Sequence, residues 1–117
     1  MSGARSYHAG RAAEVAVEQL YTRSGRTVCA RRWRGAAGEI DLIARDGNEV
    51  IFIEVKQSTT HAEAAEHLTP RQMARIYASA SDYLAGEPGG QSTPSRFDVA
   101  LVDGRGRIEI LENAFAA

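Results

Sequence analysis

The clearest alternation of apolar and polar positions lies between residues 38 and 56, where two apolar runs flank the tripeptide Asp46-Gly47-Asn48. Gly and Asn tolerate the positive φ angles that tight hairpin turns require. The segment therefore predicts two antiparallel strands, over residues 38–44 and 49–56. Both strands carry large apolar residues on both faces, so we expect them in the middle of a sheet that is covered on both sides.

Side chains alternate between the two faces of a strand, so the pattern also predicts which residues share a face. The first strand is predicted to present on one face Glu39, Asp41 and Ile43, and on the other Ile40, Leu42 and Ala44. The second strand is predicted to present on one face Val50, Phe52, Glu54 and Lys56, and on the other Ile51, Ile53 and Val55. Three carboxylates and one ammonium group are thus expected on strands that otherwise have a buried pattern.

Helical spacing occurs in two other segments. Residues 10–24 carry an apolar stripe that ends at Gly25, which predicts a first helix. The sequence Thr69-Pro70-Arg71-Gln72 predicts the start of a second helix, because Thr caps, Pro suits a first turn and Gln completes a capping box. Further strands are predicted over residues 27–34, 96–102 and 107–111. The order helix, three strands, helix, two strands predicts an α/β fold with a mixed five-stranded sheet flanked by two helices.

Length and composition predict one soluble domain over residues 1–117, with 44% hydrophobic and 25% charged residues. A flexible N-terminus is expected over residues 1–9, a mobile polar loop over 57–66, and a flexible connection rich in Gly, Pro and Ser over 86–95. The chain has no run of eighteen apolar residues and no hydrophobic leader, and its lone Cys29 has no partner for an internal disulfide. The sequence therefore predicts a cytoplasmic protein with no membrane partner.

The predicted cluster of carboxylates needs an explanation, because burying a charge is costly unless the charge is paired or coordinates a metal. Two or three carboxylates form an oxygen-rich site of the kind that suits Mg²⁺ or Mn²⁺. A metal there would polarise a phosphoryl oxygen and help to generate hydroxide, while Lys56 would position or deprotonate the attacking water. Lys56 is also the only lysine beside thirteen arginines. The alternative is a buried salt bridge of Asp41 or Glu54 with Lys56 that only fixes the strand register.

Arginines surround an aromatic residue in the first predicted strand, at Arg31, Arg32, Trp33 and Arg34. This combination is typical of contacts to a phosphate backbone and an unstacked base. The alternative is an edge strand with solvated arginines, in which Trp33 covers the core.

A second pair of arginines, Arg71 and Arg75, shares a face of the second predicted helix and is expected either to meet a phosphate or to be solvated. Residues 1–34 hold seven Arg against two Glu, whereas residues 35–117 hold seven basic and thirteen acidic residues. Such segregation of charge permits a nucleic-acid-binding surface on a chain whose net charge is −1.

An Asp before a hairpin and Glu-x-Lys after it resemble the PD-(D/E)xK nuclease superfamily. More closely, the chain resembles the YraN-like family of small bacterial proteins, in motifs that run in order from Gly10 to Phe115. These motifs are Gly10-Arg11-Ala12-Ala13-Glu14, Trp33-Arg34, Gly38-Glu39-Ile40-Asp41-Leu42-Ile43-Ala44-Arg45-Asp46-Gly47, Phe52-Ile53-Glu54-Val55-Lys56, Leu68-Thr69-Pro70-Arg71-Gln72, Arg96-Phe97-Asp98-Val99 and Glu112-Asn113-Ala114-Phe115.

The resemblance implies a restriction-endonuclease-like fold, related to the Holliday-junction-resolvase branch. It further implies that Asp41 and Glu54 bind the metal and that Lys56 is catalytic. It suggests that Glu14, on the first helix, completes the acidic site, and even with the resemblance a solvated Glu14 stays equally open. The chain departs from the superfamily pattern in having Ile40 where the name has Pro, and Gln57-Ser58 where relatives often carry Thr-Arg.

The leading hypothesis is therefore a Mg²⁺- or Mn²⁺-dependent nuclease, or a nuclease-like protein, that acts on structured or branched DNA by phosphodiester hydrolysis. In it Asp41 and Glu54 bind the metal, Glu39 or Glu14 supports the metal through water, and Lys56 acts on the nucleophilic water. The alternative is a non-catalytic nucleic-acid-binding module with the same fold. A third hypothesis is action through a protein partner or as a homodimer.

Overall fold

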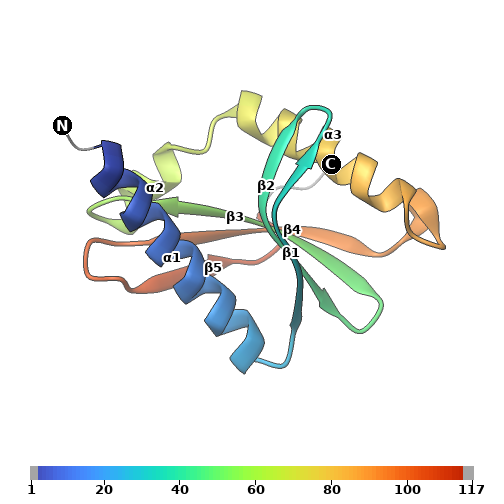
Figure 1. Ribbon diagram of the computed structural model, residues 1–117, viewed down its shortest axis with the longest axis horizontal. Coiled ribbons are helices and arrows are strands. Elements are labelled where there is room, and N and C mark those ends of the chain that lie inside the picture. The colour runs from blue at the N-terminus through green and yellow to red at the C-terminus, as the bar shows by residue number, and fades with distance from the viewer. Residues whose placement is uncertain (1–2, 115–117) are drawn as a thin grey trace.

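Five strands form one mixed sheet in the order β1-β2-β3-β4-β5 (Figure 1). The computed structural model describes residues 3–114, with side chains from residue 10 onward. The strands are β1 (Thr27–Gly35), β2 (Gly38–Asp46), β3 (Glu49–Gln57), β4 (Ser95–Val102) and β5 (Ile108–Leu111). Only β3 and β4 pair in parallel, and the other neighbours are antiparallel. The predicted α/β fold with a mixed five-stranded sheet is confirmed.

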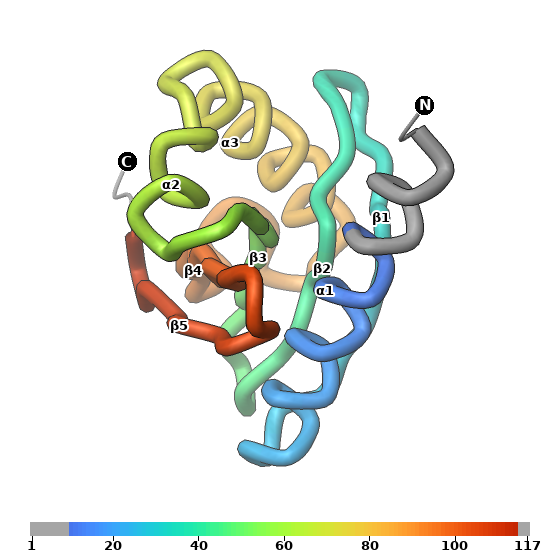
Figure 2. The backbone as a smooth tube through the Cα atoms, turned by 90° about the vertical axis from the view of Figure 1, so that its left-hand side faces the viewer, coloured from blue at the N-terminus to red at the C-terminus, as the bar shows by residue number. Residues whose placement is uncertain are grey.

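The helices cover both faces of this sheet (Figure 2). They are α1 (Gly3–Arg23), α2 (His61–Glu66) and α3 (Pro70–Ala85), followed by a short 3-10 helix, η1 (Gly90–Ser92). Apolar residues of α1 pack on one face, against Leu42, Ala44, Ile51 and Ile53. Apolar residues of α3 pack on the other, against Ile40, Ile43, Val50 and Phe52. Within the described residues, no helix is long and apolar enough to span a membrane.

Two helix predictions need correction. Helix α1 begins at Gly3 rather than Gly10. The flexibility expected over residues 1–9 stays a prediction, and residues 1–2 lie outside the described residues. The loop expected over residues 57–66 contains α2, which makes three α-helices where two were predicted. Thr60 caps α2 by accepting a hydrogen bond from the Glu63 N–H, and Ala64 is buried against β4. The spacing Thr-x-x-Glu is a capping signal that the overall polarity of the segment hid.

The start of α3 has the predicted capping box, since Thr69 accepts from the Gln72 N–H and the Gln72 side chain accepts from the Thr69 N–H. Residues 86–95 contain η1, and their mobility stays a prediction.

The predicted alternation is confirmed in β3 and wrong in part of β2. Ile40 and Ile43 both pack in the α3-side core, although strict alternation places them on opposite faces. Two features accompany this change: the ladder between β2 and β3 ends at Leu42, and on the neighbouring strand Arg32 has a left-handed backbone (φ 49°). Arg32 lies between the register pairs Arg31↔Leu42 and Trp33↔Ile40, which places the irregular residue opposite Asp41.

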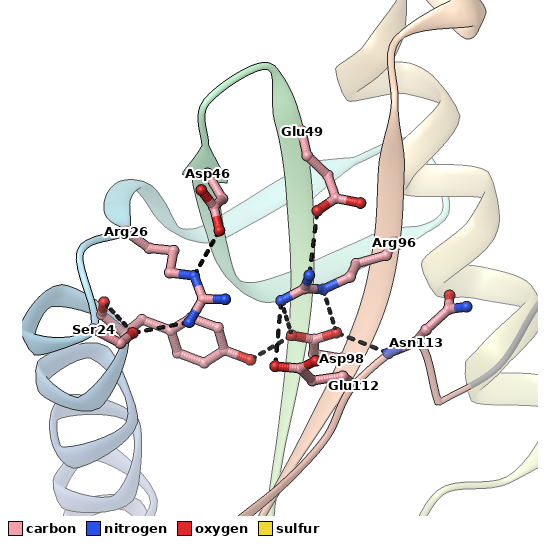
Figure 3. A network of polar contacts seen from close by, with 9 residues as sticks. Ser24, Arg26, Asp46, Glu49, Arg96, Asp98, Glu112 and Asn113 are labelled. Atoms are coloured by element: carbon pink, nitrogen blue, oxygen red, sulfur yellow. Dashed lines mark hydrogen bonds and ion pairs between the residues drawn. The ribbon is translucent and has the colours of Figure 1, made fainter.

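A buried polar network ties the N-terminal helix to the sheet (Figure 3). Asp98 on β4 is fully buried and accepts hydrogen bonds from the Tyr21 hydroxyl at 2.7 Å and from Arg96 Nε at 3.0 Å. Arg96 also pairs with Glu49 at 3.2 Å, and the Asn113 N–H donates to Asp98 at 3.0 Å. Burial of Tyr21 and its bond to Asp98 raise the pKa of that phenol above its usual range. The network joins α1, β3, β4 and the segment after β5.

The tip of the β1–β2 hairpin is fastened to α3 (Figure 1). The buried Ser79 hydroxyl donates to the Gly38 carbonyl at 2.8 Å, and the Ala36 N–H donates to the Asp82 carboxylate at 2.8 Å. Gly35 lies so close that an added Cβ would come within 2.9 Å of the Ser79 Cβ. A side chain at position 35 would therefore push the hairpin away from the helix.

We expect Gly35→Ala to lower the free energy of unfolding by about 1–3 kcal/mol, the usual cost of forcing an extra methyl group into a packed contact. Urea denaturation followed by circular dichroism measures this. Gly86→Ala is the matched control, since its added Cβ would meet only the Tyr83 carbonyl oxygen at 3.5 Å. Equal unfolding midpoints for the two variants would contradict the close approach of hairpin and helix.

Candidate functional site

A cavity of about 290 Å³ opens where the β1–β2 hairpin leaves the sheet and faces α3. It is lined by Arg34, Gly38, Glu39, Asp41, Glu54, Gln72, Arg75 and Ile76. Two predicted metal ligands, Asp41 and Glu54, therefore share one cavity with one arginine from β1 and one from α3. The predicted chemistry requires both carboxylates and cationic groups, and both line this cavity.

Asp41 points towards β3 because of the way the ladder between β2 and β3 ends. The last paired residues are Leu42 and Ile53, and beyond them the Val55 N–H donates to the Asp41 carboxylate at 2.8 Å. The side chain thus replaces the main-chain carbonyl that a continued ladder would supply. This hydrogen bond fixes the Asp41 carboxylate beside Glu54, the residue of β3 that lines the same cavity.

Glu54 and Lys56 lie on the same face of β3, as their spacing predicts. Lys56 Nζ is 3.3 Å from Glu54 Oε2, and the side chains are only 15% and 13% exposed. The other carboxyl oxygen, Glu54 Oε1, is buried and accepts no hydrogen bond from a protein donor among the described residues, and the Asp41 carboxyl group is close enough to share a proton with Glu54. A buried polar atom without a partner is costly, so this oxygen is available to a proton, a water or a cation.

Both carboxyl groups are shifted towards their protonated forms. Burial, and secondly the neighbouring Asp41 carboxylate, raise the pKa of Glu54 to about 8, against the opposing effect of Lys56. Burial likewise raises the pKa of Asp41, the Val55 N–H opposes this shift, and the charge of Glu14 adds to it. Two like charges this close are unfavourable in a buried site, so Glu54 is largely protonated at neutral pH.

The two other predicted acids are held by arginines of β1. Glu39 lines the same cavity, but its carboxylate pairs with Arg34 at 2.9 Å. Glu14 pairs with Arg32 at 3.1 Å and lines a separate, smaller cavity, although its charge reaches Asp41. Among the residues that the structure describes, no three His, Cys, Asp or Glu side chains are placed to hold a metal together.

The arginines predicted to bind nucleic acid fall into two groups. On β1, Arg31 pairs with Glu18, with Nε 2.7 Å from Oε1, so all three β1 arginines of the predicted cluster contact carboxylates. On α3, Arg71 and Arg75 are exposed, and neither forms an ion pair with another described residue. Arg75 also lines the cavity. Contact of these arginines with nucleic acid stays a prediction.

Trp33 packs at the edge of the core. Its ring meets Tyr83 edge to face with centroids 5.3 Å apart, and it lies against the core cluster on the α3 side. This is the packing that the alternative interpretation of the first strand describes. A contact between Trp33 and an unstacked base stays a prediction.

Sequence reasoning did not foresee two features of the cavity. The sequence predicts Gln72 only as a capping residue and gives Ile76 no role, yet both line the cavity beside Arg75. Their spacing of three and four residues, which places side chains on one helix face, was the available signal. The Arg34–Glu39 pair was not foreseen either, although the two residues are register partners across the hairpin.

The residues present suit a small divalent cation. Mg²⁺ is usually held in proteins by one or two carboxylates, together with several waters and substrate phosphates. Asp41 and Glu54 supply two carboxylates at one cavity, and Glu54 Oε1 is a buried oxygen without a partner. The donor set is all oxygen, as hard cations prefer. Asp41 and Glu54 are therefore the residues that would hold such an ion.

We expect the stabilising contribution of Glu54 to fall as pH rises. Its pKa is higher in the folded chain, about 8, than the ordinary value of 4.5, so the folded state retains the proton longer. This contribution is fully present below about pH 4.5 and is lost as pH rises through about 8, with a slope of at most about 1.4 kcal/mol per pH unit. The measurement is urea denaturation from pH 5 to 8.5 for the wild type and Glu54→Gln.

The quantity to compare is the free energy of unfolding of the wild type minus that of Glu54→Gln, because the subtraction removes groups common to both. This difference should decline across the range. A constant difference would show that Glu54 ionises normally in the folded protein, and a difference that rises with pH would show that its pKa is lowered, so either result would contradict a raised pKa.

The comparisons with known proteins agree on one family. The model of the uncharacterised protein family UPF0102 matches residues 13–102. A UPF0102 protein of Cereibacter sphaeroides strain KD131 is 71% identical over 117 residues, which are 100% of both chains. A UPF0102 protein of Ruegeria pomeroyi is 61% identical over 97% of this chain and 92% of its own, and one of Dinoroseobacter shibae is 42% identical over 95% and 83%. These matches confirm the YraN-like resemblance, and the chain belongs to the UPF0102 family.

Proposed function

We propose that this protein is a divalent-metal-dependent nuclease that hydrolyses phosphodiester bonds of DNA at the cavity between β2, β3 and α3. The observation that carries the proposal is the convergence of two partly buried carboxylates, Asp41 and Glu54, with the ammonium group of Lys56. A structural salt bridge alone needs only one carboxylate for one lysine. The second carboxylate raises the cost of burial, and a cation would offset that cost.

Asp41 and Glu54 would hold Mg²⁺ or Mn²⁺, which in such a site polarises a phosphoryl oxygen and favours ionisation of a water. The Val55 N–H fixes the orientation of Asp41, and Lys56 fixes one oxygen of Glu54. Glu54 must lose its proton to act as a ligand, because only the ionised carboxylate binds the cation well. The site is therefore more competent at mildly alkaline pH.

Lys56 would act on the attacking water. Its side chain is mostly buried and lies next to Glu54, so its ammonium group is fixed near any water that the carboxylates hold. The lysine ammonium group is a compact point charge with three rotatable donors, whereas the thirteen arginines of the chain carry a planar, delocalised charge. Lys56 orients the water and stabilises the charge that develops on the phosphoryl group.

Arg75 faces these groups from α3 across the same cavity. It forms no ion pair with a described residue, and a guanidinium fork matches the oxygens of a phosphate. A backbone phosphate held by Arg75 would bring the DNA strand to the carboxylates. The resemblance to the Holliday-junction-resolvase branch extends the proposal to branched DNA, for which two symmetric cuts would require two copies of the chain.

Asp41→Asn should abolish metal-dependent cleavage, with a loss of at least about a hundredfold, because several kcal/mol of charge stabilisation depend on the cation. Calorimetric titration of Mn²⁺ and Mg²⁺ should show binding to the wild type and none to the variant. Cleavage is assayed on a four-way junction and on linear duplex. Asp46→Asn is the matched control, since Asp46 lies at the other end of β2 and pairs with Arg26.

Retained cleavage in Asp41→Asn would overturn the assignment of the site. Salt-sensitive DNA binding without scission at any metal concentration would instead identify a binding module that keeps the fold. Preference for the junction over the duplex would support branched DNA as the substrate.

Lys56→Gln should lower the cleavage rate by about a hundredfold, a usual loss for a positioned proton-transfer group. Mn²⁺ affinity should not fall, because the carboxylates remain and one positive charge is removed. Single-turnover cleavage at saturating metal, beside calorimetry, separates the two effects. A parallel loss of metal binding would mean that Lys56 only holds Glu54 in place.

A further inference from the structure

The acid best placed to become a third ligand is held away from that role by one ion pair. Glu39 lines the cavity of Asp41 and Glu54, yet its carboxylate pairs with Arg34 at 2.9 Å. Within the described residues, these three acids do not form a metal-holding group as they stand. The Arg34–Glu39 pair therefore decides whether the cavity offers two carboxylates or three.

This ion pair is easy to open. The Arg34 side chain is 71% exposed and the Glu39 side chain 42% exposed, and ion pairs this open to water contribute little to stability. Both residues lie near the tip of the β1–β2 hairpin, as register partners on neighbouring strands. Exchange of the Arg34 partner thus requires rotation of two solvated side chains and no change of the backbone.

The other candidate acid is less suited to such an exchange. The Glu14–Arg32 pair is only 21% and 32% exposed, and it lines a separate cavity of about 50 Å³. The Arg34–Glu39 pair shares its cavity with Asp41, Glu54 and Arg75. An incoming phosphate at this cavity meets Arg34 directly, and it competes with Glu39 for the same guanidinium group.

We propose that Arg34 exchanges Glu39 for a phosphate of the substrate, and that the released Glu39 carboxylate joins Asp41 and Glu54 around the divalent cation. The proposal rests on the proposed function and adds a substrate-dependent step to it. Phosphate and cation then each favour the binding of the other, and such a coupling is reciprocal in equilibrium terms. The free protein holds the cation weakly, and the complete site forms only when a phosphodiester is present.

The exchange predicts effects of opposite sign for the two partners. Arg34→Ala frees Glu39 permanently, so Mn²⁺ affinity in the absence of phosphate should rise about fivefold over the wild type. Glu39→Gln removes the third carboxylate, so Mn²⁺ affinity should not rise. In the double variant Arg34→Ala with Glu39→Gln the gain should disappear, because the gain requires the released carboxylate. A general effect of removing a positive charge would persist in the double variant.

The experiment is calorimetric titration of Mn²⁺ into each protein, with and without dimethyl phosphate as a minimal phosphodiester. Dimethyl phosphate should raise the Mn²⁺ affinity of the wild type and leave that of Arg34→Ala almost unchanged. Arg107→Ala is the matched control, since the Arg107 side chain is 68% exposed, against 71% for Arg34, and its ion-pair partner, Asp103, lies outside the cavity. It should behave like the wild type in both titrations.

The exchange is overturned if Arg34→Ala binds Mn²⁺ no better than Arg107→Ala does. It is also overturned if the gain in Mn²⁺ affinity survives in the double variant. Arg34→Gln serves the same comparison if the alanine variant is unstable. The proposed function fails separately, when the wild type binds no Mn²⁺ or when Asp41→Asn binds it equally well. Wild-type binding that is lost in Asp41→Asn, without a gain in Arg34→Ala, would leave the metal site in place and remove only the exchange.

Discussion

The hydrogen bond from the Val55 N–H to the Asp41 carboxylate is the interaction on which the site depends. It lies just beyond the last pair of the β2–β3 ladder, where a central strand would otherwise leave a buried donor without a partner. The fold therefore needs an acceptor at position 41, whatever the chemistry. Because the acceptor is a carboxylate, the same bond sets a negative charge beside Glu54. The raised pKa of Glu54 follows from this placement and from burial.

The cavity exists because the hairpin leaves the sheet at this point. Beyond Asp41, the β1–β2 hairpin is no longer paired to β3, and its tip is fastened to α3 by Ser79 and Asp82. The separation of β2 from β3 opens space at Asp41 and Glu54, and the attachment to α3 brings Arg75 to its other side. A continuous ladder would have filled that space with paired main chain. The early end of the β2–β3 ladder therefore accounts both for the positions of the Asp41 and Glu54 carboxylates and for the opening that leads to them.

The elements that the sequence predicted well are those governed by local pattern. Alternation in β3, the Asp46-Gly47-Asn48 turn and the Thr69 capping box depend on near neighbours, and the structure has all three. The side assigned to Ile40 was wrong. Strict alternation fails between Ile40 and Ile43, where the ladder with β3 ends and where the adjacent strand has a left-handed residue, Arg32, and no local signal in β2 records either feature.

The site was predictable in its carboxylates and not in their partners. Asp41, Glu54 and Lys56 follow from strand spacing across one hairpin, which is short-range information. The pairing of Glu39 with Arg34 and of Glu14 with Arg32 depends on long flexible side chains that choose among several partners of opposite charge. Such choices are decided by three-dimensional distance and by small energies, so residue order alone does not determine them.

Two buried carboxylates on neighbouring strands show how a structural acid differs from a candidate functional one. Asp98 and Glu54 are one register step apart, since Asp98 pairs with Ile53, and both are largely excluded from water. Asp98 has both oxygens engaged, by Tyr21, Arg96 and the Asn113 N–H. Glu54 has one oxygen shared with Lys56 and the other without a partner. Folding alone accounts for the first arrangement, because every buried polar atom is satisfied. The second leaves a costly buried oxygen facing a cavity, and a ligand that binds there would compensate for that cost.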